Sequence, residues 1–439
     1  MLSREDNDLL TRTGPDTAAG RLLRAYWQPV ALSSEMPEQR PVKAVRLLGE
    51  DLVLFRDEAG AWGLVGRFCA HRGVDLSFAR REDGGLRCLY HGWLYGPDGR
   101  CREQPAEPEH SRFHEKVRIA GYPCAERNGI VFAYLGGGEP PPFPSYDWAV
   151  APREFTFAFK GLWECNWLQG LEGGIDPSHV SFLHRFLAED PREVYGQQFR
   201  EEVAGTGRSL SDITGELFRP DIEVEPDVHG LRVFAVRSLT DEVRHVRVTN
   251  LLFPNAFVVP FGNDRVFCQW HVPVDDGSHY WYMVLYDFRE HTDHETLLQQ
   301  RLAGVSLPDY RPLRHRGNGW GFDPAEQEST TFTGMGLDIN VHDQWAVESM
   351  GRVQDRTREH LGVSDRAVTA NRRLLLRAIA AHAAGQPVPG LPADEAAARE
   401  LRGPLAVDTT TPADGWQRHW REQEAKRRTG SPWAAEFPV

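Results

Sequence analysis

Two short stretches combine cysteine and histidine at a spacing that suits a metal centre. One residue lies between Cys69 and His71, and two lie between Cys88 and His91. Sixteen residues separate the two pairs. Two thiolates and two imidazoles on neighbouring loops can bind a structural Zn²⁺ or a [2Fe–2S] cluster with histidine on one iron. Zinc sites usually place about two to four residues between their first ligands. The single-residue spacing therefore favours the iron–sulfur cluster, with zinc as the alternative.

A second candidate metal site follows about ninety positions later, where His179 and His184 lie close together in the sequence, shortly after Glu172 and Asp176. A lone histidine pair is weak evidence, because buried and surface histidines are common. Two neutral imidazoles with one carboxylate, however, form the facial triad of non-haem Fe(II) oxygenases, which leaves positions open for O2 and substrate. This region therefore predicts a catalytic iron site that needs one more ligand.

The best candidate for the third ligand is Asp343, at the start of a helix predicted over 341–352. A carboxylate in the first turn of a helix is also a common capping residue. Asp338 and His342 are the alternatives if Asp343 has that role.

Composition narrows the class of protein that could carry these sites. The chain has 439 residues and a net charge of −13, which argues against a nucleic-acid partner because phosphate contacts need clustered Lys and Arg. We expect no membrane span, since no apolar run reaches about 18 residues. Six cysteines are too few for a disulfide framework at this length, so a reducing, cytoplasmic location is expected.

Short alternating apolar runs between turns predict an all-β domain over 41–145 that carries the two Cys/His loops. The Pro-rich stretch 140–145 marks its end. Residues 1–40 are expected to form an N-terminal arm with one helix, packing with the catalytic domain. The rest, 146–439, is predicted as that catalytic domain, an antiparallel sheet surrounded by helices. The expected fold class is therefore α+β.

The sequence Cys-Ala-His-Arg-Gly at 69–73 and Cys-Leu-Tyr-His-Gly-Trp at 88–93 resembles the Rieske domain of ring-hydroxylating oxygenase α subunits. Residues 9–35, Asn-Trp-Leu-Gln at 166–169 and the stretch 355–365 resemble the phthalate-dioxygenase branch of these enzymes. The resemblance covers nearly the whole chain. It implies that Cys69 and Cys88 bind one iron of a [2Fe–2S] cluster and that His71 and His91 bind the other.

The resemblance also implies that His179, His184 and Asp343 hold a mononuclear Fe(II). In that family an aspartate at the position of Asp176 bridges an iron histidine to a Rieske histidine of the next subunit. Here it would connect His179 with His91 across an interface. A homotrimer or a dimer of trimers is therefore expected.

The implied function is that of a terminal oxygenase, which uses O2 and electrons from a separate NAD(P)H-dependent flavin and iron–sulfur reductase. The implied substrate is a small aromatic molecule, with an aromatic carboxylic acid favoured. Arg247, Arg244 and Arg208 are the candidates for binding its carboxylate, and His245 and Asn250 are weaker ones. The alternatives are a monooxygenase or O-demethylase on the same scaffold, a Rieske electron carrier without oxygenase activity, and a zinc-structured binding protein. Residues 301–327 are interpreted either as a lid or as a subunit contact.

Overall fold

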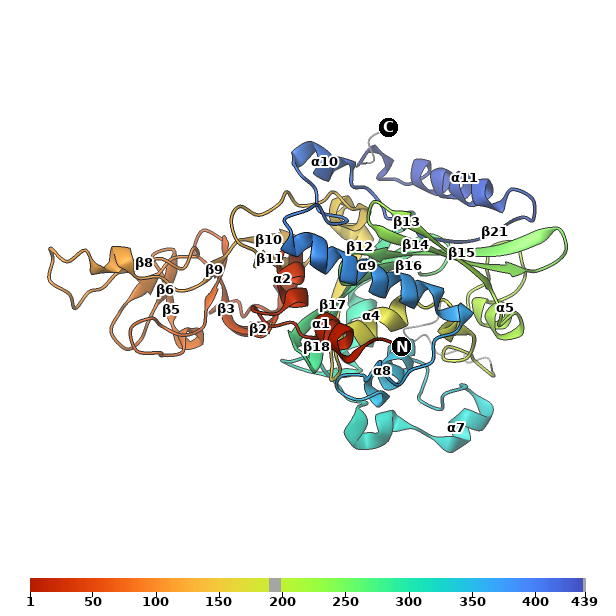
Figure 1. Ribbon diagram of the computed structural model, residues 1–439, viewed down its shortest axis with the longest axis horizontal. Coiled ribbons are helices and arrows are strands. Elements are labelled where there is room, and N and C mark those ends of the chain that lie inside the picture. Colours follow the sequence, from red (N-terminus) through yellow and green to blue (C-terminus); the bar gives the residue numbers. More distant parts are fainter. Residues whose placement is uncertain (189–198, 437–439) are drawn as a thin grey trace. The chain divides into compact units, whose positions relative to one another are not determined.

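The structure is a computed structural model that describes residues 1–188 and 199–436. It separates into two compact units (Figure 1). The smaller unit comprises residues 12–141 with 272–275, and the larger comprises 1–11, 142–271 and 276–439. The division between residues 141 and 142 falls within the Pro-rich stretch 140–145.

The smaller unit is built from three small antiparallel sheets, with the strand orders β1-β11-β10, β2-β3-β4-β9 and β5-β6-β7-β8. Their strands are β1 (Trp27–Leu32), β2 (Val42–Leu47), β3 (Glu50–Arg56), β4 (Trp62–Gly66), β5 (Arg80–Glu82), β6 (Gly85–Arg87), β7 (Leu94–Tyr95), β8 (Cys101–Glu103), β9 (Gly121–Tyr122), β10 (Cys124–Arg127) and β11 (Ile130–Tyr134). The two Cys/His loops follow β4 and β6. Cys69 and Cys88 belong to the same buried cluster as Val53, Phe55 and Tyr95, so the loops are anchored in the core of the unit.

The predicted arm over 1–40 is divided between the units. Helix α1 (Arg4–Thr11) groups with the larger unit, where Leu2 N–H donates to the carbonyl of Arg356. Helix α2 (Ala18–Arg24) and β1 group with the smaller unit, because β1 pairs with β11 there.

The larger unit contains one antiparallel sheet of eight strands in the order β12-β18-β17-β16-β15-β14-β13, with β21 paired to β15. The strands are β12 (Thr156–Trp163), β13 (Asp221–Asp227), β14 (Gly230–Ser238), β15 (Val243–Leu252), β16 (Ala256–Pro260), β17 (Arg265–Asp275), β18 (Ser278–Asp287) and β21 (Val407–Pro412). The prediction of a catalytic-type antiparallel sheet with helices around it is confirmed.

Helices cover both faces of this sheet. On β14, Val233 packs with Ala367 of α9 (Arg366–Ala383), whereas Phe234 packs with Trp416 and Trp420 of α11 (Trp416–Thr429). Because successive strand residues point to opposite faces, α9 and α11 lie on opposite sides. Figure 1 shows both as blue helices.

The remaining helices of eight or more residues in this unit are α4 (Trp167–Ile175), α6 (His294–Leu302) and α8 (Ile339–Ser349). Helix α4 begins where the Asn166 side chain accepts a hydrogen bond from Leu168 N–H, and it contacts α8, α9 and the sheet. Among the helices of residues 1–188 and 199–436, none has both the length and the apolar character to cross a bilayer.

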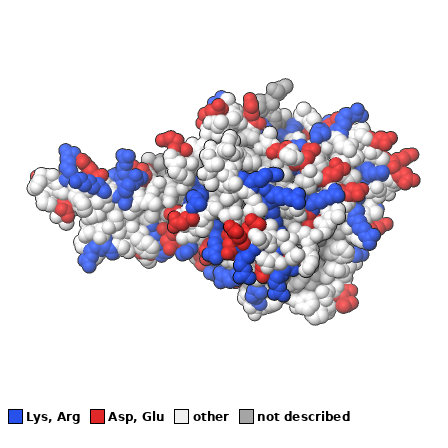
Figure 2. All heavy atoms as spheres, viewed as in Figure 1, with Lys and Arg blue, Asp and Glu red and all other residues white. Residues whose placement is uncertain are grey.

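The surface carries charges of both signs. On the face drawn in Figure 2, Lys and Arg side chains lie among Asp and Glu side chains.

Candidate functional site

The two Cys/His loops share one backbone design. In each loop the cysteine N–H donates to the carbonyl five residues later, and the cysteine carbonyl accepts from a glycine N–H four residues later. The four hydrogen bonds are Cys69 N to Val74 O, 2.9 Å; Gly73 N to Cys69 O, 2.8 Å; Cys88 N to Trp93 O, 2.9 Å; and Gly92 N to Cys88 O, 3.0 Å. Both glycines have positive φ, +73° and +74°, which a residue with a Cβ rarely adopts.

The side chains of these loops fit a buried metal cluster. Cys69 and Cys88 are both buried, and burial raises the pKa of the Cys88 thiol. Burial makes the charged thiolate unfavourable, and a metal bound in place of the thiol proton offsets that cost. The rings of His71 and His91 lie with centroids 4.4 Å apart. The Nδ1 atom of His91 is buried and finds no hydrogen-bond partner within the described chain, so its lone pair is available to a metal.

Two neighbouring aromatic residues complete this site. The Tyr95 hydroxyl lies 3.3 Å from Cys69 Sγ and accepts a hydrogen bond from Ala70 N–H at 3.1 Å. Trp93 stacks on His71, with centroids 4.5 Å apart and planes 9° apart. Tyr95 is not among the predicted site residues, although its position two residues after Trp93 places both side chains on one side of an extended segment.

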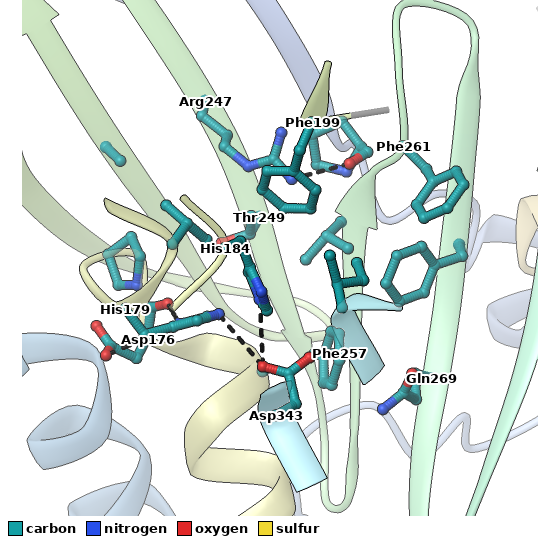
Figure 3. A pocket seen from close by; sticks show the side chains of 18 of the residues that line it. Asp176, His179, His184, Phe199, Arg247, Thr249, Phe257, Phe261, Gln269 and Asp343 are labelled. Carbon is teal, nitrogen blue, oxygen red and sulfur yellow. Dashed lines mark hydrogen bonds and ion pairs between the residues drawn. The ribbon is translucent and has the colours of Figure 1, made fainter. Parts of the chain in front are cut away.

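In the larger unit, His179, His184 and Asp343 come together, with one ligand atom of each within 4.8 Å of the others. Asp343 Oδ1 is 3.2 Å from His184 Nε2 and 3.8 Å from His179 Nε2. Figure 3 shows the three side chains pointing toward one another. Two imidazoles and one carboxylate in this arrangement suit Fe(II) and leave further positions open.

His179 is held in place just after the end of α4. His179 opens a 3₁₀ turn, His179–Ser181, just after α4, and its Nδ1 is 2.6 Å from the main-chain oxygen of Asp176. A carbonyl only accepts, so Nδ1 carries the proton and Nε2 presents a lone pair toward Asp343. The Asp176 carboxylate is 3.9 Å from His179 Nδ1 and instead accepts from Ser178 N–H at 2.8 Å.

The two alternatives to Asp343 have other partners. Asp338 caps α8 by accepting from Asn340 N–H at 3.0 Å, and it pairs with Arg301 at 3.2 Å. His342 Nε2 is 2.7 Å from the Gly336 carbonyl. Neither belongs to the group of converging ligand atoms.

The protonation states suit metal binding. Burial lowers the pKa of His179, and the neighbouring His184 lowers it further, so the imidazole is neutral near pH 7. Burial opposes ionisation of Asp343, but the adjacent His184 and His179 outweigh it, and the pKa of Asp343 is lowered. The site therefore offers a neutral Nε2 from His179 and an ionised carboxylate from Asp343, with the His184 ring beside them.

Glu172, four residues before Asp176, has a structural role. It is buried in α4 and pairs with Arg356 at 2.9 Å and with Arg372 of α9. Burial opposes its ionisation, yet the two guanidinium groups lower its pKa.

A pocket opens beside the trio, with an apolar wall and a few polar groups (Figure 3). The wall residues are Val180, Phe199, Ala235, Phe257, Val259, Phe261, Phe267 and Ile339. Apart from Pro260, the sheet residues that line the pocket alternate along their strands, and several lie opposite one another, as in the pairs Ala235–Arg247, Val259–Phe267 and Phe257–Gln269. One face of the sheet therefore forms the floor.

Of the three candidate arginines, Arg247 lines this pocket. Its guanidinium pairs with Asp408 of β21 and donates to the Pro260 carbonyl at 2.9 Å. Asp408 also contacts His245, and both neighbours lower its pKa against the effect of burial.

Arg244 and Arg208 are not in the described lining. Arg244 donates to the carbonyl of Thr240 at 2.7 Å, and Arg208 pairs with Glu216. The weaker candidate Asn250 donates to the carbonyl of Leu405.

The possible lid, 301–327, contributes no described residue to this lining either. Its Trp320 is buried and donates to Glu348 Oε2 at 2.8 Å.

Comparison with known protein families assigns both units. Residues 26–123 match the Rieske [2Fe-2S] domain, and residues 133–431 match the family described as LigXa C-terminal domain like. The phthalate 4,5-dioxygenase oxygenase subunit of Pseudomonas putida is 36% identical over 401 residues, which cover 88% of this chain and 88% of that protein. The chain belongs to the Rieske non-haem iron oxygenases.

Two further comparisons agree with this family. The 5,5'-dehydrodivanillate O-demethylase oxygenase subunit of a Sphingobium species is 33% identical over 386 residues, covering 86% of this chain and 80% of that protein. The oxygenase of carbazole 1,9a-dioxygenase, solved in complex with its ferredoxin, shares the fold with a TM-score of 0.53 at 22% identity, covering 87% of this chain and 95% of that one.

Membership of this family confirms the prediction of an oxygenase with a Rieske [2Fe–2S] domain and a mononuclear iron in the catalytic domain. The readings as a zinc-structured binding protein or a simple electron carrier are set aside.

Proposed function

We propose that this Rieske oxygenase binds its Fe(II) through His179, His184 and Asp343 and hydroxylates an aromatic molecule held in the adjacent pocket. The observation that carries the proposal is the convergence of the three ligand atoms within 4.8 Å beside the apolar wall. In the smaller unit, Cys69, His71, Cys88 and His91 hold the [2Fe–2S] cluster.

The chain's own residues orient the substrate and the metal ligands, and they exclude water from the site. When bound, the cluster stores electrons and Fe(II) activates O2, so the protein supplies position and surroundings. Phe199, Phe257, Phe261 and Phe267 offer flat apolar surface to an aromatic ring and keep water away from the trio. Asp176 fixes the tautomer of His179 through its main-chain oxygen.

Asp176 is further proposed to connect subunits. Its side chain is 23% exposed, so the carboxylate is accessible to a donor from another molecule. We propose that it accepts from His91 of a neighbouring subunit in a homotrimer or a dimer of trimers. Electrons come from a separate NAD(P)H-dependent flavin and iron–sulfur reductase. The ferredoxin bound to the carbazole 1,9a-dioxygenase oxygenase supports a separate donor.

The proposed substrate class is an aromatic carboxylic acid, supported by the phthalate-oxidising relative and by Arg247 in the pocket. A second candidate is a neutral aromatic ether, processed by O-demethylation. It is favoured by the pairing of Arg247 with Asp408, which offsets the positive charge that a carboxylate would need.

The test is a reductase-coupled screen with the two metal centres loaded, following O2 uptake and product mass. The panel contains phthalate, 3-chlorobenzoate, vanillate and the methyl ester of each. Turnover of the acids but not of their esters supports an acid substrate, whereas equal turnover of acids and esters, with formaldehyde released from methyl vanillate as well as from vanillate, supports the neutral ether.

His179→Ala separates catalysis from electron storage. It should keep the visible Rieske spectrum and form no O2-dependent product. His360→Ala, at an exposed histidine, is the matched control and should behave as wild type. Product formation by His179→Ala would overturn the iron assignment. Asp176→Asn with both centres loaded should lose turnover, and full activity would refute the bridge.

A further inference from the structure

A buried chain of hydrogen bonds runs from the pocket into the core of the larger unit. It begins at Gln269 of β17, which lines the pocket, and continues through His271 and His279 to the main-chain oxygen of Cys165. Both histidines are fully buried.

The direction of these hydrogen bonds follows from the last one, between His279 and Cys165. His279 Nδ1 is 2.7 Å from the Cys165 carbonyl, which can only accept, so Nδ1 carries the proton. Burial lowers the pKa of His279 to about 4, so the ring is neutral and its Nε2 must accept. The donor to it is His271 Nδ1, at 2.9 Å.

His271 is also neutral, with one donor and one acceptor nitrogen. Burial, and then His279, hold the pKa of His271 well below its ordinary value, so His271 Nε2 is also an acceptor. The group 3.3 Å from it is the Gln269 amide nitrogen, which donates. An amide flipped the other way would require protons on Nε2 of both rings and leave His279 Nδ1 facing a carbonyl without one.

The backbone is shaped around this chain. Helix α4 crosses the histidine pair at Gly170, where a Cβ would lie 2.3 Å from His271 Nδ1 and 2.8 Å from His279 Nε2. A side chain at that position would have to displace the rings. These hydrogen bonds, from Gln269 through His271 and His279 to Cys165, form a relay. The relay packs against α4, the helix that leads to His179, and each restricts the position of the other.

We propose that Gln269 is a specificity-determining residue, held by this relay so that its Oε1 accepts a hydrogen bond from a hydroxyl or N–H group of the substrate. Among the described residues Oε1 has no partner, although its amide nitrogen is occupied. A fixed acceptor favours molecules that carry a donor at the matching position and disfavours analogues that lack it.

This inference rests on the proposed function, because it assigns the pocket to the substrate. It narrows the substrate to an aromatic molecule with a phenolic hydroxyl or an amino group. The acid and ether readings are both compatible with it, since either class can carry such a group.

The test uses matched pairs that differ in one donor, namely vanillate with veratrate and 3-hydroxybenzoate with 3-methoxybenzoate. Binding to the metal-loaded protein is measured by calorimetry. Wild type should bind the hydroxyl-bearing member of at least one pair about tenfold more tightly. Gln269→Met should abolish that preference. His279→Phe, which removes the anchor without touching the pocket, should reduce it.

Gln299→Met, at a glutamine on α6 that donates to Glu295, is the control and should keep the wild-type preference. Equal affinity of wild type for both members of every pair overturns the role of Gln269, as does a preference that survives Gln269→Met. The proposed function fails separately, by absence of O2-dependent product from the whole panel, and calorimetry still decides the role of Gln269. If Gln269→Met does not fold, the His279→Phe preference decides alone.

Discussion

The two candidate metal sites are built in opposite ways. In the smaller unit, all four ligands lie on two loops that close with the same pair of backbone hydrogen bonds, between residues 69 and 93. In the larger unit, two ligands follow α4 and the third comes from α8, so that His179 and Asp343 are far apart in the sequence. The first site depends on local turn geometry, and the second depends on how helices pack.

The largest effect is expected at the assembled site. Asp343→Ala removes the one ligand that comes from α8, so the mononuclear iron should be lost and O2-dependent product formation should fall about 10³-fold or more. The Rieske spectrum should not change, because its ligands are on local loops. Metal analysis and single-turnover product yield measure this. Asp338→Asn, at the cap of the same helix, should retain iron, and iron loss in both variants would indicate damage to α8 instead.

The packing beneath that site is tested by Glu172→Gln. The substitution removes the buried carboxylate that pairs with both Arg356 and Arg372, and in the described chain only Arg372 keeps another carboxylate partner, Glu359. It should lower the free energy of unfolding by about 3–5 kcal/mol. Chemical denaturation followed by tryptophan fluorescence measures the loss.

A control variant and a metal-binding measurement test whether Glu172 acts only through its buried ion pairs. Glu422→Gln, at an exposed ion pair with Arg418, should change stability by less than about 0.5 kcal/mol. The folded Glu172→Gln protein should still bind iron; if it cannot, Glu172 has a role at the metal that its contacts do not indicate.

The local site is tested at its two glycines. Gly73→Ala should cost about 1–2 kcal/mol, because φ is +73° although a Cβ would meet nothing within 4 Å. Gly92→Ala should cost at least as much, since its Cβ would also lie 3.2 Å from Pro105. Unfolding monitored by the Rieske absorbance measures both. Gly137→Ala, with the same open space and no positive φ, should be nearly neutral; an equal loss there would contradict the turn argument.

The smallest effect is expected from Tyr95→Phe. The Tyr95 hydroxyl is 3.3 Å from Cys69 Sγ, and a hydrogen bond to the sulfur stabilises the reduced form. Its loss, worth about 1 kcal/mol, should lower the reduction potential by about 40 mV in redox titration. Tyr90→Phe removes a hydroxyl that contacts Arg72 instead and should cause no comparable shift. A similar shift in both variants would assign the effect to general disturbance of the loop.

The sequence predicted local features better than distant ones. The spacing of Cys69, His71, Cys88 and His91 was sufficient to indicate an iron–sulfur site, because each ligand pair occupies one turn. Asp343 was placed through family resemblance, since nothing local distinguishes it from the helix-capping Asp338. The α+β architecture was readable from the alternation of apolar residues.

Other features depend on contacts between distant segments. The arm 1–40 divides because α1 and β1 find different partners. Arg244 and Arg247 lie in the same predicted strand and are both candidates from the sequence, but only the strand register places Arg247 opposite Ala235 on the pocket face. The relay behind Gln269 could not be foreseen, because it requires the carbonyl of Cys165 to meet a histidine from another strand.

The pairing of β15 with β21 has a consequence for how the protein is made. Strand β21 supplies Asp408 and covers β15 along residues 243–248. A ribosome completes the iron ligands well before residue 408, so the nascent larger unit holds Arg247 without its counter-ion and leaves the edge of β15 open to other strands. A chain that stops before residue 407 would contain every proposed metal ligand and yet be prone to aggregate.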